Sequence, residues 1–312
     1  SNPVIRRERI ILLSFLVLLG AGWGITQPLS KIAVSTGHGH FGLIFWQLVI
    51  GASLMGIVML LRRDRLPRTA ATLRVFVIIA LVGTIIPNSA SYKAVVHIPA
   101  GVMSVLLSLV PLAAFPMALG LGLERFSFRR FGGLLLGLAG VGLLVLPETS
   151  LPEPGMLKWV AVATIAAACY AFEGNYVARW GIAGMNPMQV MFGASVVGAL
   201  LSLPLALGSG QFINPLRPWD EAEWALIASS IVHTVTYTGY VWLVGRAGSV
   251  FAVQVSYLVT GFGVFWAMLL LGESYSPYFW AAAGLMLAGV FIVQPRKQEP
   301  LASAAAMKET GR

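Results

Sequence analysis

The side chains best suited to bind a small molecule are polar residues that stand inside long apolar stretches of the sequence. Glu173 is the only acidic residue well inside such a stretch, and Tyr170 and Tyr176 stand three residues before and after it. At helical spacing the two rings share a broad face with the carboxylate. This arrangement suits an ammonium group, through charge pairing and cation–π attraction. The alternative is a structural glutamate that is hydrogen-bonded to a neighbouring helix or that extends toward solvent.

Other apolar stretches contribute further groups of this kind. His233 and Tyr237 stand four residues apart, and imidazole titrates near neutral pH, although a hydrogen-bonded packing role is also open for His233. Pro87 removes a backbone donor just before Asn88 and Tyr92, and broken helices often line substrate sites. The predicted wall of a substrate-binding site consists of Trp23, Gln27, Asn88, Tyr92, Tyr170, Glu173, His233, Tyr237, Gln254 and Tyr257.

Motifs for catalysis, cofactors or metals are missing from the sequence. There is no GxxxxGK[ST] to hold nucleotide phosphates and no HExxH to hold zinc. His38 and His40 have no third ligand in view, so we interpret them as loop residues and expect no metal or cofactor. The single cysteine, Cys169, rules out an intrachain disulfide. A membrane enzyme acting on lipid would need clustered catalytic groups, whereas the polar groups here are scattered, so we expect no enzyme.

Helices that cross a membrane must position these groups. Of the 312 residues, 57% are hydrophobic and 11% are charged, against about 25% charged in ordinary soluble domains. Apolar runs of roughly 18 or more residues are typical of membrane helices. The sequence predicts an all-α membrane protein with ten transmembrane helices, at residues 10–34, 41–61, 74–97, 99–123, 131–147, 156–180, 187–208, 222–246, 248–271 and 277–294.

The placement of the basic residues predicts how the chain is oriented. The formal net charge of +9 could on its own indicate a nucleic-acid partner. With ten helices and a cytoplasmic N-terminus, however, seventeen Lys and Arg residues fall inside, and four fall outside: Lys31, Lys93, Lys158 and Arg217. This distribution follows the positive-inside rule. We therefore expect a multi-pass protein of the bacterial inner (plasma) membrane, with both termini in the cytoplasm and no nucleic-acid partner.

The two halves of the chain resemble each other. The word LAGV occurs at 138–141 and at 287–290, and Glu124 and Glu273 stand fourteen residues before the two copies. Because five helices are an odd number, the second repeat must be inverted, and inverted repeats are typical of transporters with a midplane site. Gene duplication in a static membrane protein is the alternative. The predicted division is a first five-helix repeat at 1–147, a periplasmic linker at 148–155, a second repeat at 156–295 and a flexible cytoplasmic tail at 296–312.

Three features carry a resemblance to a known family, namely the proline of SLVPLAAF, the glutamate after LGL and the run GLLLGLAGV. They resemble the EamA domain of the drug/metabolite transporter superfamily, and the second half carries a weaker copy through Glu273 and LAGV. AGWG at 21–24 and Lys31 fit the start of the family. The resemblance implies a ten-helix secondary transporter, and the chain looks most similar to the bacterial exporters of amino acids, especially aromatic ones.

The expected function is therefore the export of small metabolites, amino acids first among them, across the lipid bilayer by alternating access at a midplane cavity. A sugar phosphate would need fixed cations in the middle of the spans, and the sequence has none there. Small multidrug carriers of this superfamily use a glutamate in helix 1, which helix 1 here lacks. The alternatives are a multidrug or other metabolite exporter of the same superfamily, and a receptor or scaffold without flux. The oligomeric state stays open.

Overall fold

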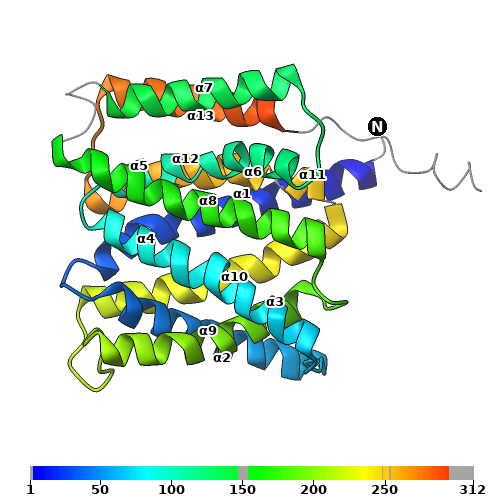
Figure 1. The fold of residues 1–312 in the computed structure, drawn as a ribbon, viewed down its shortest axis with the longest axis vertical. Coiled ribbons are helices and arrows are strands. Elements are labelled where there is room, and N and C mark those ends of the chain that lie inside the picture. The colour runs from blue at the N-terminus through cyan, green and yellow to red at the C-terminus, as the bar shows by residue number, and fades with distance from the viewer. Residues whose placement is uncertain (1–2, 147–153, 248, 253, 295–312) are drawn as a thin grey trace, which may run out of the picture.

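The computed structural model describes residues 3–146, 154–247, 249–252 and 254–294, which form helices joined by short loops, without a strand (Figure 1). The helices lie roughly parallel to one another and stack in layers. α1 (Pro3–Ala33) begins and α13 (Pro277–Val293) ends at the same end of the stack, as an even number of crossings requires. Most of the expected linker at 148–155, and all of the expected tail at 296–312, lie outside the described residues.

Each of the ten apolar runs coincides with one helix or with consecutive short helices. In the described part of the chain, seven helical spans are long and apolar enough to cross a membrane, and two further apolar helices, α12 and α13, are shorter. The chain is therefore an all-helical, multi-pass membrane protein, and ten crossings stay a prediction. The other helices are α2 (His40–Arg62), α3 (Ala70–Ala80), η1 (Leu81–Ile85), α4 (Ile86–Val95), α5 (Ala100–Leu106), α6 (Leu109–Gly120), α7 (Phe128–Val145), η2 (Pro154–Met156), α8 (Leu157–Trp180), α9 (Pro187–Gly208), α10 (Glu221–Ala247), α11 (Ser249–Ala252) and α12 (Val255–Leu271).

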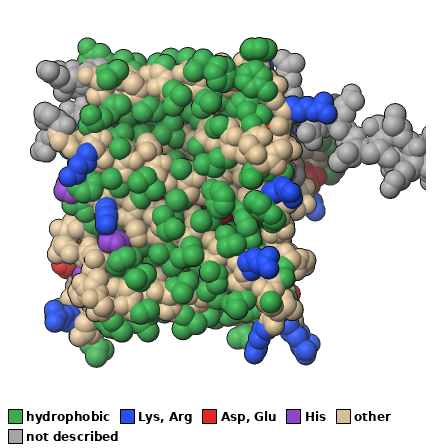
Figure 2. Space-filling view, in the orientation of Figure 1, with side chains coloured by type: hydrophobic (Ala, Val, Ile, Leu, Met, Phe, Trp, Pro, Cys, Tyr) green, Lys and Arg blue, Asp and Glu red, His purple; other side chains and the backbone are tan. Residues whose placement is uncertain are grey.

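Apolar surface and charge are separated along the helix axes. On the face in Figure 2, hydrophobic side chains cover the middle, and Lys and Arg gather toward the two ends of the helices. Large apolar side chains such as Leu18, Leu200 and Phe291 are exposed on the helices. Water would make so much exposed apolar surface costly, whereas the hydrocarbon core of a bilayer requires it.

The third span changes its helical form near the middle. α3 continues into the π-helical segment η1 and then into α4, whose first turn contains Pro87. Proline has no N–H group, so the carbonyl of Gly83, four residues earlier, loses its α-helical partner. The N–H of Ile86 instead bonds the carbonyl of Leu81, five residues earlier, which is the spacing of a π-helix. The disturbance expected at Pro87 therefore lies in the turn before it.

The fourth span is interrupted for a related reason. α5 ends at Leu106 and α6 begins at Leu109. Pro111 has no N–H group for the carbonyl of Leu107, so the α-helical ladder cannot run through this point unbroken. Ser108 lies in the gap, and its hydroxyl donates to the Val105 carbonyl at 2.6 Å. Both interruptions bring irregular backbone and polar groups inside the helix stack, where they line the cavity described below.

Glycines allow two pairs of helices to cross closely. A Cβ atom added to Gly289, in the second LAGV, would lie 2.7 Å from the Gly133 carbonyl oxygen and 2.8 Å from the Gly137 nitrogen. α7 and α13 thus cross backbone against backbone, and both copies of LAGV belong to this helix pair. A Cβ atom added to Gly24 of α1 would likewise lie 2.8 Å from the Gly263 nitrogen of α12. Close crossings through glycine are typical of helices in membranes.

Candidate functional site

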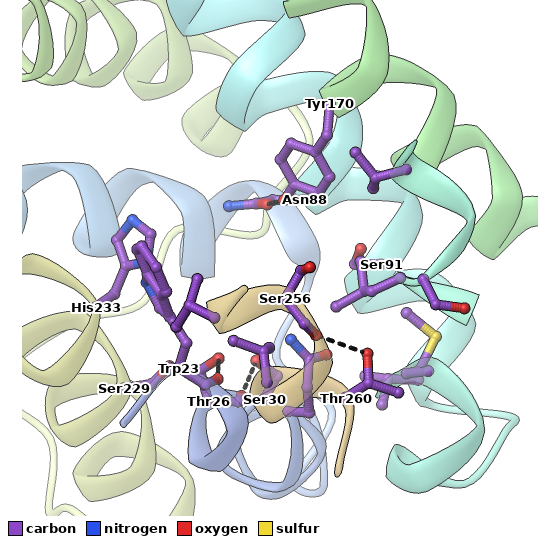
Figure 3. Close-up of a pocket in the computed structure, with 18 of the residues that line it drawn as sticks. Trp23, Thr26, Ser30, Asn88, Ser91, Tyr170, Ser229, His233, Ser256 and Thr260 are labelled. Atoms are coloured by element: carbon purple, nitrogen blue, oxygen red, sulfur yellow. Dashed lines mark hydrogen bonds between the residues drawn. The ribbon is translucent and has the colours of Figure 1, made fainter. Parts of the chain in front are cut away.

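A cavity of about 540 Å³ lies between the two halves of the sequence. Its wall comes from α1, α2, η1, α4, α5 and α6 in the first half and from α8, α10, α12 and α13 in the second. Figure 3 shows Trp23 and His233 on one side, Asn88 and Tyr170 on another, and Thr260 on a third. Hydroxyls, amides, rings and aliphatic groups form this wall, and no described residue lining it is Asp, Glu, Lys or Arg. A molecule in the cavity would meet neutral polar groups.

Four side chains on three helices form a hydrogen-bonded network in the cavity wall. Asn88 and Tyr92 stand four residues apart and share a face of α4. The Asn88 Nδ2 group and the Tyr92 hydroxyl both donate to Oε1 of Gln47 on α2, at 3.2 and 3.0 Å. The hydroxyl of Tyr170 on α8 donates to Asn88 Oδ1 at 2.7 Å. The network therefore ties the interrupted third span to both of its neighbours.

Trp23 and His233 form a second contact across the cavity wall. The Trp23 Nε1 group of α1 donates to Nδ1 of His233 on α10 at 3.2 Å. In a neutral imidazole one nitrogen accepts and the other carries the proton, so this contact places the proton of neutral His233 on Nε2. The Trp23 ring also packs against Tyr240, with ring centroids 5.2 Å apart. The aromatic groups and the imidazole together give this part of the wall an apolar surface with one polar edge.

The structure divides the residues predicted to bind substrate into two groups. Those that line the cavity are Trp23, Gln27, Asn88, Tyr92, Tyr170, His233 and Tyr257. Glu173, Tyr237 and Gln254 are not among the residues that line it. The Gln254 amide instead donates to the side chain of Gln294 at 3.4 Å. A role of any of these residues in substrate binding stays a prediction.

Glu173 of α8 lies against the backbone of η1, which forms part of the cavity wall. A Cβ atom added to Gly83, which lines the cavity, would lie 2.7 Å from Oε2 of Glu173. Glycine at this position lets the α8 carboxylate approach the π-helical backbone closely. The carboxylate does not line the cavity, so the ammonium-partner hypothesis requires a rearrangement that brings it into contact with the substrate.

Sequence reasoning missed several residues of the wall, above all Gln47. The expected wall left out α2 and α13, yet Gln47, Leu287 and Val290 all line the cavity. Tyr240, which packs on Trp23, was also missed. A polar side chain inside an apolar run is the signal that could have identified Gln47, because the same signal singled out Gln27 and Asn88.

Charged side chains join the helices near one end of the stack. Glu273, in the loop after α12, accepts hydrogen bonds from the backbone N–H groups of Ala100 and Gly101, at 2.9 and 3.0 Å, and from the Tyr275 hydroxyl at 2.8 Å. Lys31 of α1 donates to the carbonyls of Val95 and Ile98, at 2.8 and 3.0 Å. We call Lys31, Glu273, Tyr275 and the first turn of α5 the Glu273 cluster. It holds the two halves together beside the cavity-lining residues Val95 and Met103.

The glutamate that precedes the first LAGV has a different partner. Glu124 pairs with Arg130 at 2.9 Å, within the connection from α6 to α7. Arg130 also donates to the Val293 carbonyl at 2.6 Å, and Arg129 donates to the Gln294 carbonyl at 2.9 Å. These contacts hold the end of α13 against α7. Glu273 therefore caps the N-terminus of α5, whereas Glu124 forms a salt bridge.

Membrane helices of both halves around an uncharged, hydrogen-bonding cavity define a class of protein, the multi-pass membrane proteins with an internal site for a small molecule. Comparison with protein families identifies the group within this class. The EamA-like transporter family matches residues 10–146 and, separately, residues 157–294. The chain belongs to the EamA-like transporter family.

The individual proteins that the chain resembles share less than 30% of its sequence. The chain is 27% identical over 209 residues to an "Uncharacterized transporter" from Archaeoglobus fulgidus, covering 64% of this chain and 69% of that protein. It is 23% identical over 290 residues to a "Probable terminal-alkyne amino-acid exporter" from Streptantibioticus cattleyicolor, covering 90% of this chain and 92% of that protein. A solved structure titled "Crystal structure of protein" aligns with a TM-score of 0.60 at 19% identity, over 96% of this chain and 99% of that one. The likeness to the solved structure shows the fold.

Proposed function

We propose that the protein is a secondary or facilitative transporter that exports amino acids through the cavity by alternating access. The observation that carries this proposal is the wall of neutral donors, acceptors and rings contributed by both halves. A zwitterion has no net charge for such a wall to neutralise, while its side chain can pack on Trp23 and Tyr240. The naming of the Streptantibioticus cattleyicolor relative as an amino-acid exporter supports the same substrate class.

Other substrates of the superfamily fit the wall less well. A sugar phosphate would require cations, and a cationic drug would require an anion, yet the described lining residues include neither kind. Burying an unpaired charge against neutral groups is costly. A catalytic role would need a nucleophile, an acid and a base in one place, and the lining hydroxyls bring no such set together. These arguments favour transport of a neutral or zwitterionic solute over the alternatives.

The proposal includes two inverted five-helix repeats, at 1–147 and 156–295, in a bacterial inner membrane with cytoplasmic termini. The two separate family matches support the division. The helix packing supports a two-fold relation between the repeats, because α1 packs on α12 and α10, and α8 packs on the corresponding helices of the first half, α6 and α4. A half-turn about an axis in the membrane plane would exchange these two sets, as in transporters that alternate around a midplane site.

Transport by the purified protein tests this function. Proteoliposomes should accumulate radiolabelled L-phenylalanine or another neutral amino acid faster than protein-free liposomes, and an excess of unlabelled substrate should compete. Repeating the assay with and without a pH gradient separates proton-coupled from facilitative transport. A panel of amino acids, sugar phosphates and quaternary ammonium drugs serves as the specificity control. Flux of only the cationic drugs would contradict the assignment, and absence of flux for every solute would favour a receptor or scaffold.

A further inference from the structure

The hydrogen-bonded network in the cavity wall has a direction. The Tyr170 hydroxyl donates to the Asn88 side-chain oxygen, and the Asn88 nitrogen then donates to the Gln47 side-chain oxygen. The Tyr92 hydroxyl donates to the same oxygen of Gln47. Each amide oxygen is therefore used as an acceptor within the network. The amide nitrogen of Gln47 stands at the end of this series of bonds.

The Gln47 nitrogen is the unused end of the network. A side-chain amide nitrogen has two N–H donors. Among the residues that the structure describes, none accepts a hydrogen bond from this nitrogen, and Gln47 lines the cavity. The two donors to its oxygen fix the orientation of the amide, so that the N–H groups are directed away from Asn88 and Tyr92. A site of this kind is prepared for a ligand atom that accepts hydrogen bonds.

We propose that Gln47, oriented by Asn88, Tyr92 and Tyr170, binds the carboxylate of the transported molecule. This inference rests on the proposed export of amino acids and assigns one end of the substrate to one side of the cavity. Hydrogen bonds donated to a carboxylate stabilise its charged form even without a cation nearby. The hydroxyl of Ser91, on α4, also lines the cavity and provides a further donor. The wall around Trp23 and Tyr240 is then left for the apolar side chain of the substrate.

The charge of the wall determines which anion fits. A carboxylate carries one negative charge, which the ammonium group of the same zwitterion balances. A phosphate monoester carries about 1.5 to 2 charges at neutral pH, and no described lining residue is a cation that could balance them. The neutral network therefore selects a carboxylate on a zwitterion rather than a phosphate.

Three probes that share one phenyl group separate the two ends of the substrate. L-phenylalanine has both charged groups, 3-phenylpropionate has only the carboxylate, and 2-phenylethylamine has only the ammonium. Isothermal titration calorimetry on the full-length protein in nanodiscs measures the affinity for each probe. We expect Gln47→Leu to weaken both carboxylate probes tenfold or more, the scale of one lost hydrogen bond to an ionised group. The affinity for 2-phenylethylamine should change less than twofold.

Two further variants control for folding and for position. Ser53→Ala lies on the same helix as Gln47 but is exposed outside the cavity, and it should bind all three probes as the wild type does. Tyr170→Phe keeps the ring but removes the donor that orients Asn88, and it should weaken both carboxylate probes by about threefold, because the network then loses its fixed direction. Thermal unfolding of each variant identifies any that fail to fold.

Several outcomes would overturn the assignment of Gln47. If Gln47→Leu weakens 2-phenylethylamine and L-phenylalanine and leaves 3-phenylpropionate unchanged, the amide accepts from an ammonium group and the direction of the network is reversed. Equal losses for all three probes would show that Gln47 acts through packing. A wild-type protein that binds 3-phenylpropionate but not L-phenylalanine would contradict amino-acid export. In that case, a loss of 3-phenylpropionate affinity in Gln47→Leu would still support the carboxylate site. Binding of neither carboxylate would overturn both proposals.

Discussion

The contact between Gly83, which lines the cavity, and the carboxylate of Glu173 can be tested directly. Gly83→Ala adds a Cβ atom 2.7 Å from Glu173 Oε2. Because the opposing atoms are the end of a flexible side chain, we expect the carboxylate to shift and the free energy of unfolding to fall by about 1 kcal/mol, the low end of the range for overpacking. Glu173→Ala removes the opposing carboxylate, so the same change should cost far less in that background. Thermal unfolding of the four proteins measures both effects.

Gly174→Ala is the matched control, because a Cβ atom at Gly174 of α8 meets no atom within 4 Å. Alanine has a higher helix propensity than glycine, so this variant should be as stable as the wild type or slightly more stable. An equal cost of Gly83→Ala with and without the Glu173 carboxylate would contradict the contact.

Glu173→Ala on its own tests the hypothesis that this carboxylate pairs with the ammonium group of the substrate. If it does, the apparent affinity for L-phenylalanine in proteoliposomes should fall, and the affinity for 3-phenylpropionate should not. The reason is that only the first probe loses a charge pair. Unchanged transport rate and affinity would make Glu173 a structural residue, a role that its contact with Gly83 of η1 equally allows.

The residues of the wall could be predicted only in part. The apolar run at 41–61 holds two polar side chains that are not aromatic, Gln47 and Ser53. In the structure Gln47 lines the cavity and Ser53 is exposed. Hydropathy cannot separate the two, because both faces of a membrane helix are apolar, one against lipid and one against protein. Which face turns inward is decided by contacts with other helices, mainly α9 and α10, which are distant in the sequence.

At the scale of whole elements, the Glu273 cluster should control how readily the cavity opens at its end. A carboxylate at a helix N-terminus stabilises the contact by up to about 2 kcal/mol in partly buried geometries. Glu273→Ala removes this contact with α5, and we expect faster reaction of a cysteine at Ser91 with a membrane-impermeant reagent added from outside. The assay uses a Cys169→Ala background, so that the introduced thiol is the only one.

Glu124→Ala provides the comparison for this experiment, since it breaks the Arg130 salt bridge at the opposite end of the stack. It should not accelerate labelling from outside. Glu273→Gln should have an intermediate effect, because an amide oxygen still accepts hydrogen bonds from the backbone but carries no charge. Equal labelling rates in Glu273→Ala and wild type would show that the cluster does not restrict access.

The crossing of α7 and α13 gives a second prediction at this scale. Gly289→Ala places a methyl group against backbone atoms of Gly133 and Gly137, which cannot move aside as a flexible side chain can. We expect the two helices to separate, with a loss of about 1–3 kcal/mol in stability. Gly284→Ala, on the same helix but with no atom within 4 Å of the added Cβ, should show no loss. Equal melting temperatures for the two variants would contradict the close crossing.

The positions of the helices were easier to predict than their interruptions. A membrane helix needs roughly twenty apolar residues in a row, so each helix can be predicted from its own residues, without knowledge of the helices around it. Pro87 and Pro111 indicated disturbed helices, because a missing N–H is a local property. The form of each disturbance was not predictable. A π-turn at 81–85 and a gap at 107–108 are two different ways to accommodate a proline, and the choice depends on packing around each site.

At the scale of the whole molecule, the charge distribution predicts the orientation in the membrane. The loop after α9 should be outside and the loop after α2 inside. In the Cys169→Ala background, Leu216→Cys, at a position that is 92% exposed, should react with an impermeant maleimide in intact cells. Arg65→Cys should react only after the membrane is permeabilised. The opposite pattern would mean that the termini are outside.

The extra hydrogen-bond spacing in η1 also sets the angular phase of everything that follows it. One residue turns an α-helix by about 100°, and a π-turn accommodates one residue more than an α-turn. If the same residues formed a continuous α-helix instead, α4 would be rotated by about 100°, and Asn88 and Tyr92 would turn away from Gln47 and Tyr170. The bundle could keep its helices and its crossings and yet enclose a differently lined cavity. A change between the π and the α form at constant length in this span is therefore a route by which proteins of this fold can acquire new substrates.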